Sequence, residues 1–402
     1  MTDEPAPGEG VSPQMTHAAT SLPRPTAEES ARSARLVELI RDEIAVAGGS
    51  IDFSRYMELA LYVPGLGYYR GGAQKFGASG DFVTAPELST IFARCLARPC
   101  KAILAGLGHG DILEAGVGSG ALALGLLREL EQLGALPEHY FILELSAELQ
   151  QRQRALIERE APELFSRVQW LQTLPEDKLD GIVLANEVLD AMPVHRFRVE
   201  DDGIHQLYVG WSGERFTWDS QPASPEVGGR IAPLALPPGY TSEINFQAEA
   251  WVKSLAERMN TGALLIIDYG FPQREFYHLQ RSEGTLMCHY RHRNHADPLI
   301  LTGLQDITAH VDFTAMAEAG CDSGLSLLGY TSQAAFLLAS GLTELIAESD
   351  PRAVREHLAL THEINKLTSP AEMGELYKVM ALGRGIDTPL PGFSLQDRRG
   401  RL

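Results

Sequence analysis

Apolar residues recur at two different spacings through the middle of the chain. Short apolar runs alternate with longer segments in which leucines lie three or four positions apart. The runs are typical of buried strands, and the wider spacing is typical of amphipathic helices. Strands that alternate with helices predict a parallel sheet joined by right-handed crossovers. The predicted strands are residues 112–115, 140–144, 168–171, 179–185 and 263–268, with a last strand at 377–382.

The helical spacing is clearest over residues 119–133, and further helices are predicted at 87–105, 246–259 and 313–319. Residues 1–28 are rich in Pro, Ser, Thr and Ala without apolar periodicity, so we expect a disordered tail. At its end a helix is predicted to begin at Ala27. Thr26 is its N-cap and Glu29 completes a capping box.

A glycine-rich turn follows the first predicted strand and leads into a helix. Its sequence is Glu114-Ala115-Gly116-Val117-Gly118-Ser119-Gly120. Closely spaced glycines between a strand and a helix let the backbone approach a nucleotide-like ligand at the helix N-terminus. Gly116, Gly118 and Ala121 also satisfy the dinucleotide fingerprint, so the turn alone leaves NAD open.

Acidic and polar side chains at three strand ends favour S-adenosylmethionine over NAD. Glu114 suits the cationic methionine end of that cofactor and is unfavourable beside a pyrophosphate. Glu144 ends the second strand, where a carboxylate can accept both ribose hydroxyls. The cluster at 186–190 follows the fourth strand, beside the expected methyl group. The predicted cofactor residues are Glu114, Gly116, Gly118, Ser119, Gly120 and Glu144.

Asn186, Glu187 and Asp190 follow the apolar run 181–185 and are therefore expected at the carboxyl edge of the sheet. Carboxylates there can pair with a guanidinium and fix its plane. Such a pair would polarise the guanidinium, leave one nitrogen to attack a sulfonium methyl group, and receive the released proton. These three residues are the catalytic candidates. The alternative is that Asp190 caps the next segment and Glu187 is a solvated loop residue.

The amino-acid composition, through its net charge, limits the classes of partner that the protein is expected to bind. The formal net charge is −19, with 53 acidic and 34 basic residues. This charge disfavours nucleic acid and favours a cationic target such as an arginine or lysine of another protein. No segment approaches the ~20 apolar residues of a membrane helix, and the N-terminus lacks a secretory or mitochondrial signal. We expect a bacterial cytoplasmic protein without membrane insertion. The sequence does not decide between a monomer and a homodimer.

The stretch His289–His295 is the clearest candidate for a metal site, because His292 and His295 could join Asp306, His310 or Asp312. Two interleaved arginines oppose a divalent cation, and methyl transfer from a sulfonium needs no metal. We therefore predict no metal. A loop at the substrate entrance and an ordinary surface loop both remain open.

Several separated blocks together resemble the MidA-like family, which includes bacterial relatives of the mitochondrial complex I assembly methyltransferases. They span about residues 35–385. The blocks are Tyr68-Tyr69, Gly80–Glu87, Glu114–Gly120, Asn186–Pro193, Asp268–Gly270, Gly284–Leu286 and Asp306–Phe313.

The resemblance implies an α/β, Rossmann-like, seven-stranded class I methyltransferase sheet. It also implies protein arginine methylation, with a respiratory complex I core subunit as the substrate of the mitochondrial members, and a role for Thr84 in closing over the cofactor. Two alternatives stay open: an assembly scaffold that binds the cofactor without turnover, and an NAD-dependent oxidoreductase. The expected organisation is a tail (1–28), a helical region and lid (29–106), a methyltransferase domain (107–385) with insertions at 195–245 and 270–312, and a C-terminal tail (386–402).

Overall fold

The computed structural model describes residues 22–71, 84–350 and 352–402. Its largest sheet follows the order β15-β16-β10-β5-β2-β3-β4, and β14 also pairs with β10. The five strands from β4 to β10 run parallel, whereas β16 is antiparallel to both β10 and β15. The strands are β2 (Asp111–Ala115), β3 (Tyr140–Leu143), β4 (Val168–Leu171), β5 (Leu179–Asn186), β10 (Met259–Phe271), β14 (Val311–Asp312), β15 (Ser326–Ser332) and β16 (Tyr377–Arg384).

This sheet confirms the predicted α/β, Rossmann-like class with seven strands along its main path. Every strand predicted in the methyltransferase sheet is present, with small differences at the ends. The pattern of apolar and polar residues did not predict β15. That strand contains Gly329 and a register shift between Leu327 and Gly329, so the alternation of apolar and polar residues that predicts a strand is interrupted.

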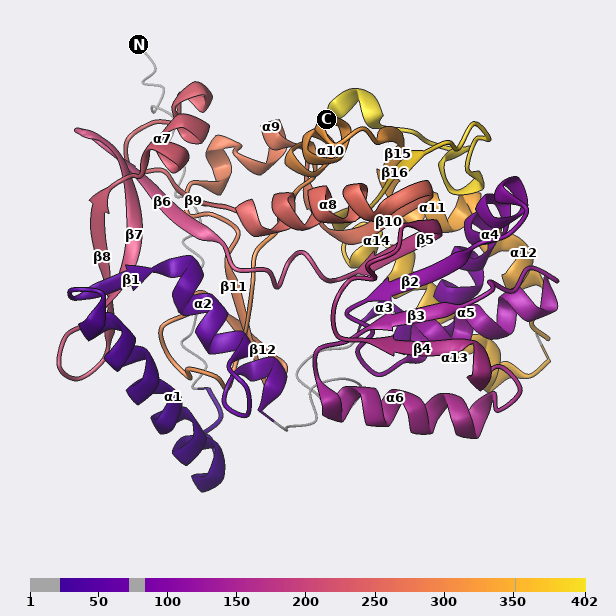
Figure 1. Cartoon of the computed structure of the whole chain (residues 1–402), viewed down its shortest axis with the longest axis horizontal. Coiled ribbons are helices and arrows are strands. Elements are labelled where there is room, and N and C mark those ends of the chain that lie inside the picture. The colour runs from indigo at the N-terminus through magenta and orange to yellow at the C-terminus, as the bar shows by residue number, and fades with distance from the viewer. Residues whose placement is uncertain (1–21, 72–83, 351) are drawn as a thin grey trace, which may run out of the picture.

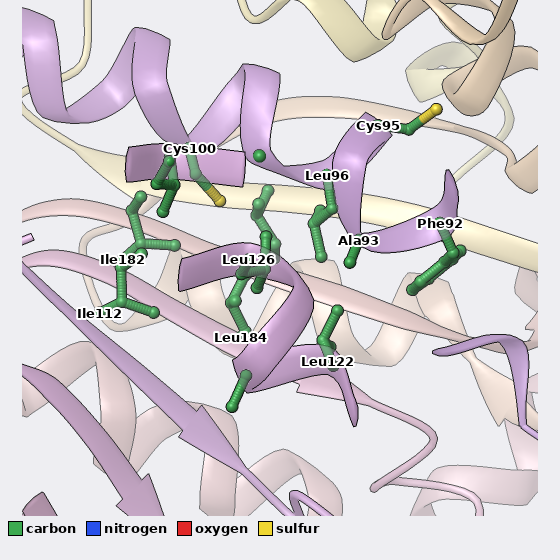
Figure 2. Packing of buried hydrophobic residues seen from close by; sticks show 14 of the residues in the cluster. Phe92, Ala93, Cys95, Leu96, Cys100, Ile112, Leu122, Leu126, Ile182 and Leu184 are labelled. Carbon is green, nitrogen blue, oxygen red and sulfur yellow. The ribbon is translucent and has the colours of Figure 1, made fainter. Parts of the chain in front are cut away.

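Helices cover both faces of this sheet (Figure 1). On β5, Ile182 and Leu184 face one apolar cluster, and Val183 faces the other. Burial on both sides explains why this strand reads as a continuous apolar run. Figure 2 shows the first cluster, where side chains from α4 (Thr90–Leu107) and α5 (Ala121–Gln132) meet the sheet. The other face packs against α8 (Phe246–Arg258) and α10 (Phe313–Asp322).

The helix expected at 87–105 is two helices, α3 (Ala85–Leu88) and α4. Ser89 separates them because its backbone is extended, with φ −154°, and its hydroxyl accepts the N–H of Ile91 to cap α4. At the N-terminus, α1 (Ala27–Val46) begins as predicted, and both halves of the Thr26–Glu29 capping box are formed.

The insertion at 195–245 forms a second sheet in the order β1-β7-β6-β9, with β8 paired to β7. The sheet also includes β1 from the N-terminal region, which pairs antiparallel with β7. Trp211 and Trp218 are partly buried and pack against an apolar cluster that includes residues of α1 and α2. The elements are β1 (Ser50–Asp52), α2 (Phe53–Tyr62), β6 (His195–Glu200), β7 (Gly203–Trp211), β8 (Phe216–Pro222), α7 (Pro225–Ile231) and β9 (Thr241–Ile244).

A third, three-stranded sheet lies between the two larger ones (Figure 1). It consists of β11 (Met287–Tyr290), β12 (Arg293–His295) and β13 (Asp306–Thr308). The stretch His289–His295 is therefore a hairpin. Arg291 and His292 form its two-residue turn, with φ 49° and 59°, values that suit a type I′ turn.

The remaining elements complete the fold around the main sheet. They are α6 (Ala147–Glu160), α9 (Gln273–Phe276), α11 (Gln333–Ala339), α12 (Leu342–Ala347), α13 (Val354–Thr368), α14 (Met373–Leu376) and the short 3-10 turns Tyr68–Arg70, Phe165–Arg167, Ala232–Leu234, Leu279–Arg281, Pro391–Phe393 and Arg399–Arg401. Within the expected C-terminal tail, Leu390 and Phe393 are buried. Most of the expected N-terminal tail, residues 1–21, lies outside the described residues. Across the described ranges, no helix has the length and apolar character needed to cross a membrane.

Candidate functional site

A cavity of about 1040 Å³ opens at the carboxyl ends of β2, β3, β5 and β10. This is the edge at which open α/β sheets bind their ligands. The volume is at the upper end of the usual range for small-molecule sites. The predicted site residues that line it are Thr84, Glu114, Gly116, Gly118, Ser119, Glu144, Asn186, Glu187 and Asp190.

Gly120 is the predicted cofactor residue that is absent from this lining. It is the N-cap of α5 with φ 92°, and a Cβ there would lie 3.3 Å from Cγ of Gln153. Its role in this position is close packing of α5 against α6. Gly116 and Gly118 do border the cavity, with φ 65° and 56°. A Cβ on Gly116 would lie 2.9 Å from Cγ2 of Val188. The positive φ of Gly116 and its close approach to Val188 therefore both require glycine at this position.

Two buried carboxylic acids flank the glycine turn. Glu114 accepts a hydrogen bond from the Tyr140 hydroxyl, and burial raises its pKa to about 8. Glu144 accepts the N–H of Ser146 at 2.8 Å, and burial raises its pKa as well. Both residues are less than a tenth exposed. A cationic or hydroxyl-bearing ligand beside them would restore interactions that burial removes.

Thr84 lies at the N-cap position of α3 and borders the same cavity. The adjacent Ala85 N–H interacts with the Glu187 carboxylate and opposes the rise in its pKa. The 84–85 segment therefore contacts the far end of the cavity. The rest of the expected lid block, residues 80–83, lies outside the described residues.

The far end of the cavity holds the Glu187 carboxylate in a strained backbone turn. Glu187 has φ 53°, rare for a residue other than glycine, and its N–H donates to the Ile267 carbonyl at 2.9 Å. Its carboxylate accepts the Tyr377 hydroxyl at 3.0 Å and the Asn186 amide at 3.3 Å. Burial, followed by the nearby Asp190 charge, raises the Glu187 pKa to about 8.

Asp190 and Asp268 extend this acidic cluster. Asp190 accepts a hydrogen bond from the Tyr269 hydroxyl, and burial raises its pKa to about 6. Asp268 is fully buried and accepts the backbone N–H groups of Leu189 at 3.0 Å and Asp190 at 3.3 Å. Burial, with the charges of Asp190 and Glu187, raises its pKa well above the usual range. Asp268 thus ties the turn after β5 to the end of β10.

Within the described ranges, no lysine or arginine forms an ion pair with Glu187, Asp190 or Asp268. Asn186 Oδ1 and Asp190 Oδ1 are buried and have no hydrogen-bond partner among the described residues. Burying an ionised carboxylate without a cation beside it lowers the free energy of unfolding. A cationic ligand at this end would offset that cost.

Several residues that line the cavity beside Glu187 and Asp190 were not predicted from the sequence as site residues. Tyr62, Tyr269, Tyr377 and His310 all border the cavity. Tyr69, part of the family block Tyr68-Tyr69, also borders it, and its hydroxyl donates to Asp306 at 2.8 Å. Tyr269 could have been found from its place at the end of a predicted strand. Tyr377 could not, because it reaches this edge only through the antiparallel direction of β16.

The metal set considered at His292 and His295 is not assembled. In the described part of the chain, the one group of three metal-ligand side chains within 4.8 Å is Glu200, Asp202 and His205, and none of these borders the large cavity. His289 and Asn294 of the hairpin do border it.

Comparison with known proteins agrees with this geometry. Residues 95–331 match the model of a family described as putative S-adenosyl-L-methionine-dependent methyltransferases. The chain is 30% identical over 376 residues to the mitochondrial protein arginine methyltransferase NDUFAF7 of Danio rerio, covering 84% of each protein. The human protein of the same name is 26% identical over 377 residues, which cover 83% of this chain and 80% of that protein.

A crystal structure of a likely methyltransferase from Burkholderia thailandensis, bound to S-adenosylhomocysteine, has a TM-score of 0.92 and 48% identity. The matched region covers 95% of this chain and 100% of the Burkholderia thailandensis chain. The glycine turn, the flanking acids and the cavity fit the cofactor that this relative binds as its demethylated product. The chain therefore belongs to the MidA-like family of methyltransferases, whose cofactor is S-adenosylmethionine.

Proposed function

We propose that the protein methylates an arginine side chain of another protein, such as a respiratory complex I subunit. The observation that carries this proposal is the buried acidic cluster of Glu187, Asp190 and Asp268, which has no lysine or arginine partner in the described structure and of which Glu187 and Asp190 border the cofactor cavity. The acidic surface, with net charge −19, also favours a cationic acceptor. The names of the NDUFAF7 relatives point in the same direction.

On the cofactor side, we propose that Glu114, Gly116, Gly118, Ser119 and Glu144 hold S-adenosylmethionine. The two glycines allow close approach of the backbone, and the N-terminus of α5 follows directly. Glu144 suits the ribose hydroxyls, and Glu114 suits the cationic methionine end. Thr84 would contribute from the 84–85 segment, and Gly120 would act only by packing α5. When bound, the cofactor supplies a methyl group already activated on a sulfonium.

On the acceptor side, Glu187 and Asp190 would bind the guanidinium and fix its plane. Each carboxylate accepts a tyrosine hydroxyl, Tyr377 for Glu187 and Tyr269 for Asp190. These bonds hold the carboxylates in place before the acceptor enters. The pair would draw positive charge toward the bound nitrogens and leave another nitrogen able to attack. Asn186 would orient Glu187 through its amide.

The proton released by methylation has a nearby acceptor. The Glu187 pKa is raised to about 8 in the ligand-free cavity. A bound guanidinium lowers that pKa by its charge and keeps the carboxylate ionised. After transfer, the same carboxylate can receive the proton from the methylated guanidinium, because the two groups are in contact.

Mass spectrometry of a deletion strain against wild type tests the function. Arginine methylation on one or more proteins should be lost in the deletion and restored by the wild-type gene. The double variant Glu187→Gln with Asp190→Asn should lower methyl transfer about 10²- to 10⁴-fold, while calorimetric affinity for S-adenosylhomocysteine stays within about 3-fold.

The matched control is Glu200→Gln with Asp202→Asn, the same chemical change on the β6–β7 hairpin outside the cavity. This variant should restore methylation fully. An unchanged methylome in the deletion strain would instead support an assembly scaffold that binds the cofactor without turnover. Loss of a lysine methylation alone would reject arginine as the acceptor.

A further inference from the structure

One face of the three-stranded sheet forms a wall of the large cavity. His289 of β11 is paired with Asn294 of β12 on one side and with Asp306 of β13 on the other. Side chains directly opposite each other on paired strands lie on the same face. All three of these residues border the cavity, and so do Met287 and Thr308, the next pair on that face. The cavity is therefore lined by this face across all three strands.

This wall extends from the proposed acceptor end of the cavity to solvent. On the inner side, Asp306 is 3% exposed. The residue after β13 is Ala309, whose N–H donates to the carbonyl of Asp190 at 2.9 Å. On the outer side, β12 is the edge strand of the sheet, and Asn294 is exposed. An edge strand thus borders the cavity where the wall meets solvent.

The outer edge of β12 presents one backbone donor and one backbone acceptor. The two-residue turn of this hairpin places Tyr290 and Arg293 in a hydrogen-bonded pair, so the next pair, His289 with Asn294, is not bonded across the two strands. The N–H and C=O of Asn294 therefore point away from β11. Among the described residues, neither group has a partner. Such an edge can accept an extended segment as an added strand.

Charges on the two sides of this edge are opposite in sign. Outside the cavity, Arg291 is already paired with Glu29 at 2.8 Å. Arg293 is exposed and forms no ion pair with a described residue. Inside the cavity are the buried carboxylates of Glu187 and Asp190. A segment with an arginine on its inner face and an acidic residue on its outer face complements both charges.

We propose that an extended segment of the acceptor protein adds to β12 as a fourth strand, with its backbone paired to that of Asn294. The inference rests on the proposed function and adds how the acceptor is held. Residues of the added strand that lie opposite Asn294, or two positions away, share the face that lines the cavity. The acceptor arginine occupies one of these positions. An acidic residue one or three positions from it lies opposite Arg293, on the other face.

The substitution Asn294→Pro tests the backbone pairing. Proline removes the outward N–H, and edge strands tolerate it where the N–H faces solvent. The matched control is Asn294→Ala, which changes the same side chain but keeps the N–H. The substrate is a synthetic peptide centred on the arginine whose methylation is lost in the deletion strain, and S-adenosylmethionine is saturating.

Asn294→Pro should raise KM for this peptide about 5- to 30-fold, because a peptide carbonyl loses its donor. Its kcat and its affinity for S-adenosylhomocysteine should stay within about 3-fold of wild type, and KM of Asn294→Ala should stay within the same range. A wild-type KM in Asn294→Pro, or an equal rise in both variants, overturns the proposal.

Amide hydrogen exchange in wild type adds a readout that needs no variant. In full-length protein saturated with S-adenosylhomocysteine, the peptide should slow exchange of the Asn294 amide at least about 10-fold, because that amide becomes bonded. Exchange in the β6–β7 hairpin should not change. Unaltered exchange at Asn294 with saturating peptide overturns the proposal even if Asn294→Pro fails to fold.

Two other outcomes separate this inference from the proposed function. If wild type sediments as a dimer and Asn294→Pro as a monomer with unchanged KM, the edge joins two copies of the chain and the docking is overturned. If arginine methylation depends on the gene but Asn294→Pro retains wild-type KM, only the docking is rejected. If no methylation depends on the gene, the proposed function is rejected and the docking with it.

Discussion

The glycine turn offers the most direct quantitative prediction, through the substitution Gly116→Ala. Gly116 has φ 65°, and an added Cβ would lie 2.9 Å from Cγ2 of Val188. A residue with a side chain in this backbone region costs about 1–2 kcal/mol. The short contact adds to that cost, because Val188 sits in the tightly bonded turn after β5 and can shift only with its neighbours.

The variant can relieve this strain by moving the turn away from its present conformation. Binding the cofactor product would then have to restore the strained form. Since 1.4 kcal/mol corresponds to a factor of ten in affinity, about 1–2 kcal/mol weakens binding of S-adenosylhomocysteine by about 5- to 30-fold. The contact with Val188 makes the upper part of this range the expected result.

Isothermal titration calorimetry with S-adenosylhomocysteine measures the effect, and thermal melts at a fixed ligand concentration give an independent value. The control is Gly134→Ala. Gly134 has φ 63°, so the backbone strain is matched, but a Cβ there has nothing within 4 Å. The control should lose about 1 kcal/mol of stability and keep its affinity. Wild-type affinity in Gly116→Ala, together with a destabilised control, would refute this account of the turn.

Three further predictions concern the acidic cluster and the core. Burial raises the folded-state pKa of Glu187 to about 8, so the stability that the protonated side chain contributes without ligand is present below the ordinary glutamate pKa and is lost as pH rises toward 8. In urea melts, Glu187→Gln should therefore make the decrease of unfolding free energy between the ordinary glutamate pKa and pH 8 less steep. An equally steep decrease in the variant would contradict this prediction. The Tyr269 hydroxyl lowers the Asp190 pKa, so Tyr269→Phe should move the acidic limb of the methyl-transfer pH profile to higher pH; a shift to lower pH would be inconsistent with the bond. Leu184 is 1% exposed between the sheet and its helices (Figure 2), so Leu184→Ala should lower the free energy of unfolding, measured by urea denaturation, by about 2–5 kcal/mol. The control Leu358→Ala, at a position that is 62% exposed, should change it by no more than about 0.5 kcal/mol. Equal losses of unfolding free energy in the two variants would argue against this core.

The sequence by itself determined the features that depend on neighbouring residues. The run 181–185 indicated a strand buried on both faces, and β5 is such a strand. Thr26 and Glu29 indicated a helix start, and their capping box is formed. The glycine spacing after β2 indicated a turn between a strand and a helix, and in that turn Gly116 and Gly118 adopt positive φ. Each of these signals lies within a few positions of the structure that it predicts.

The tertiary structure alone decided which distant side chains meet. Tyr377 bonds Glu187 across 190 positions, and Tyr69 bonds Asp306 across 237. Tyr377 arrives because β16 inserts antiparallel beside β10 and brings its first residue to the cavity edge. The sequence offered His310 only as a metal-ligand candidate and as part of a family block, whereas in the structure the N–H of its neighbour Ala309 donates to the Asp190 carbonyl at 2.9 Å and His310 borders the large cavity. Local patterns fix the secondary structure of a segment, but strand order and direction, set by burial of whole faces, choose its partners across the sheet.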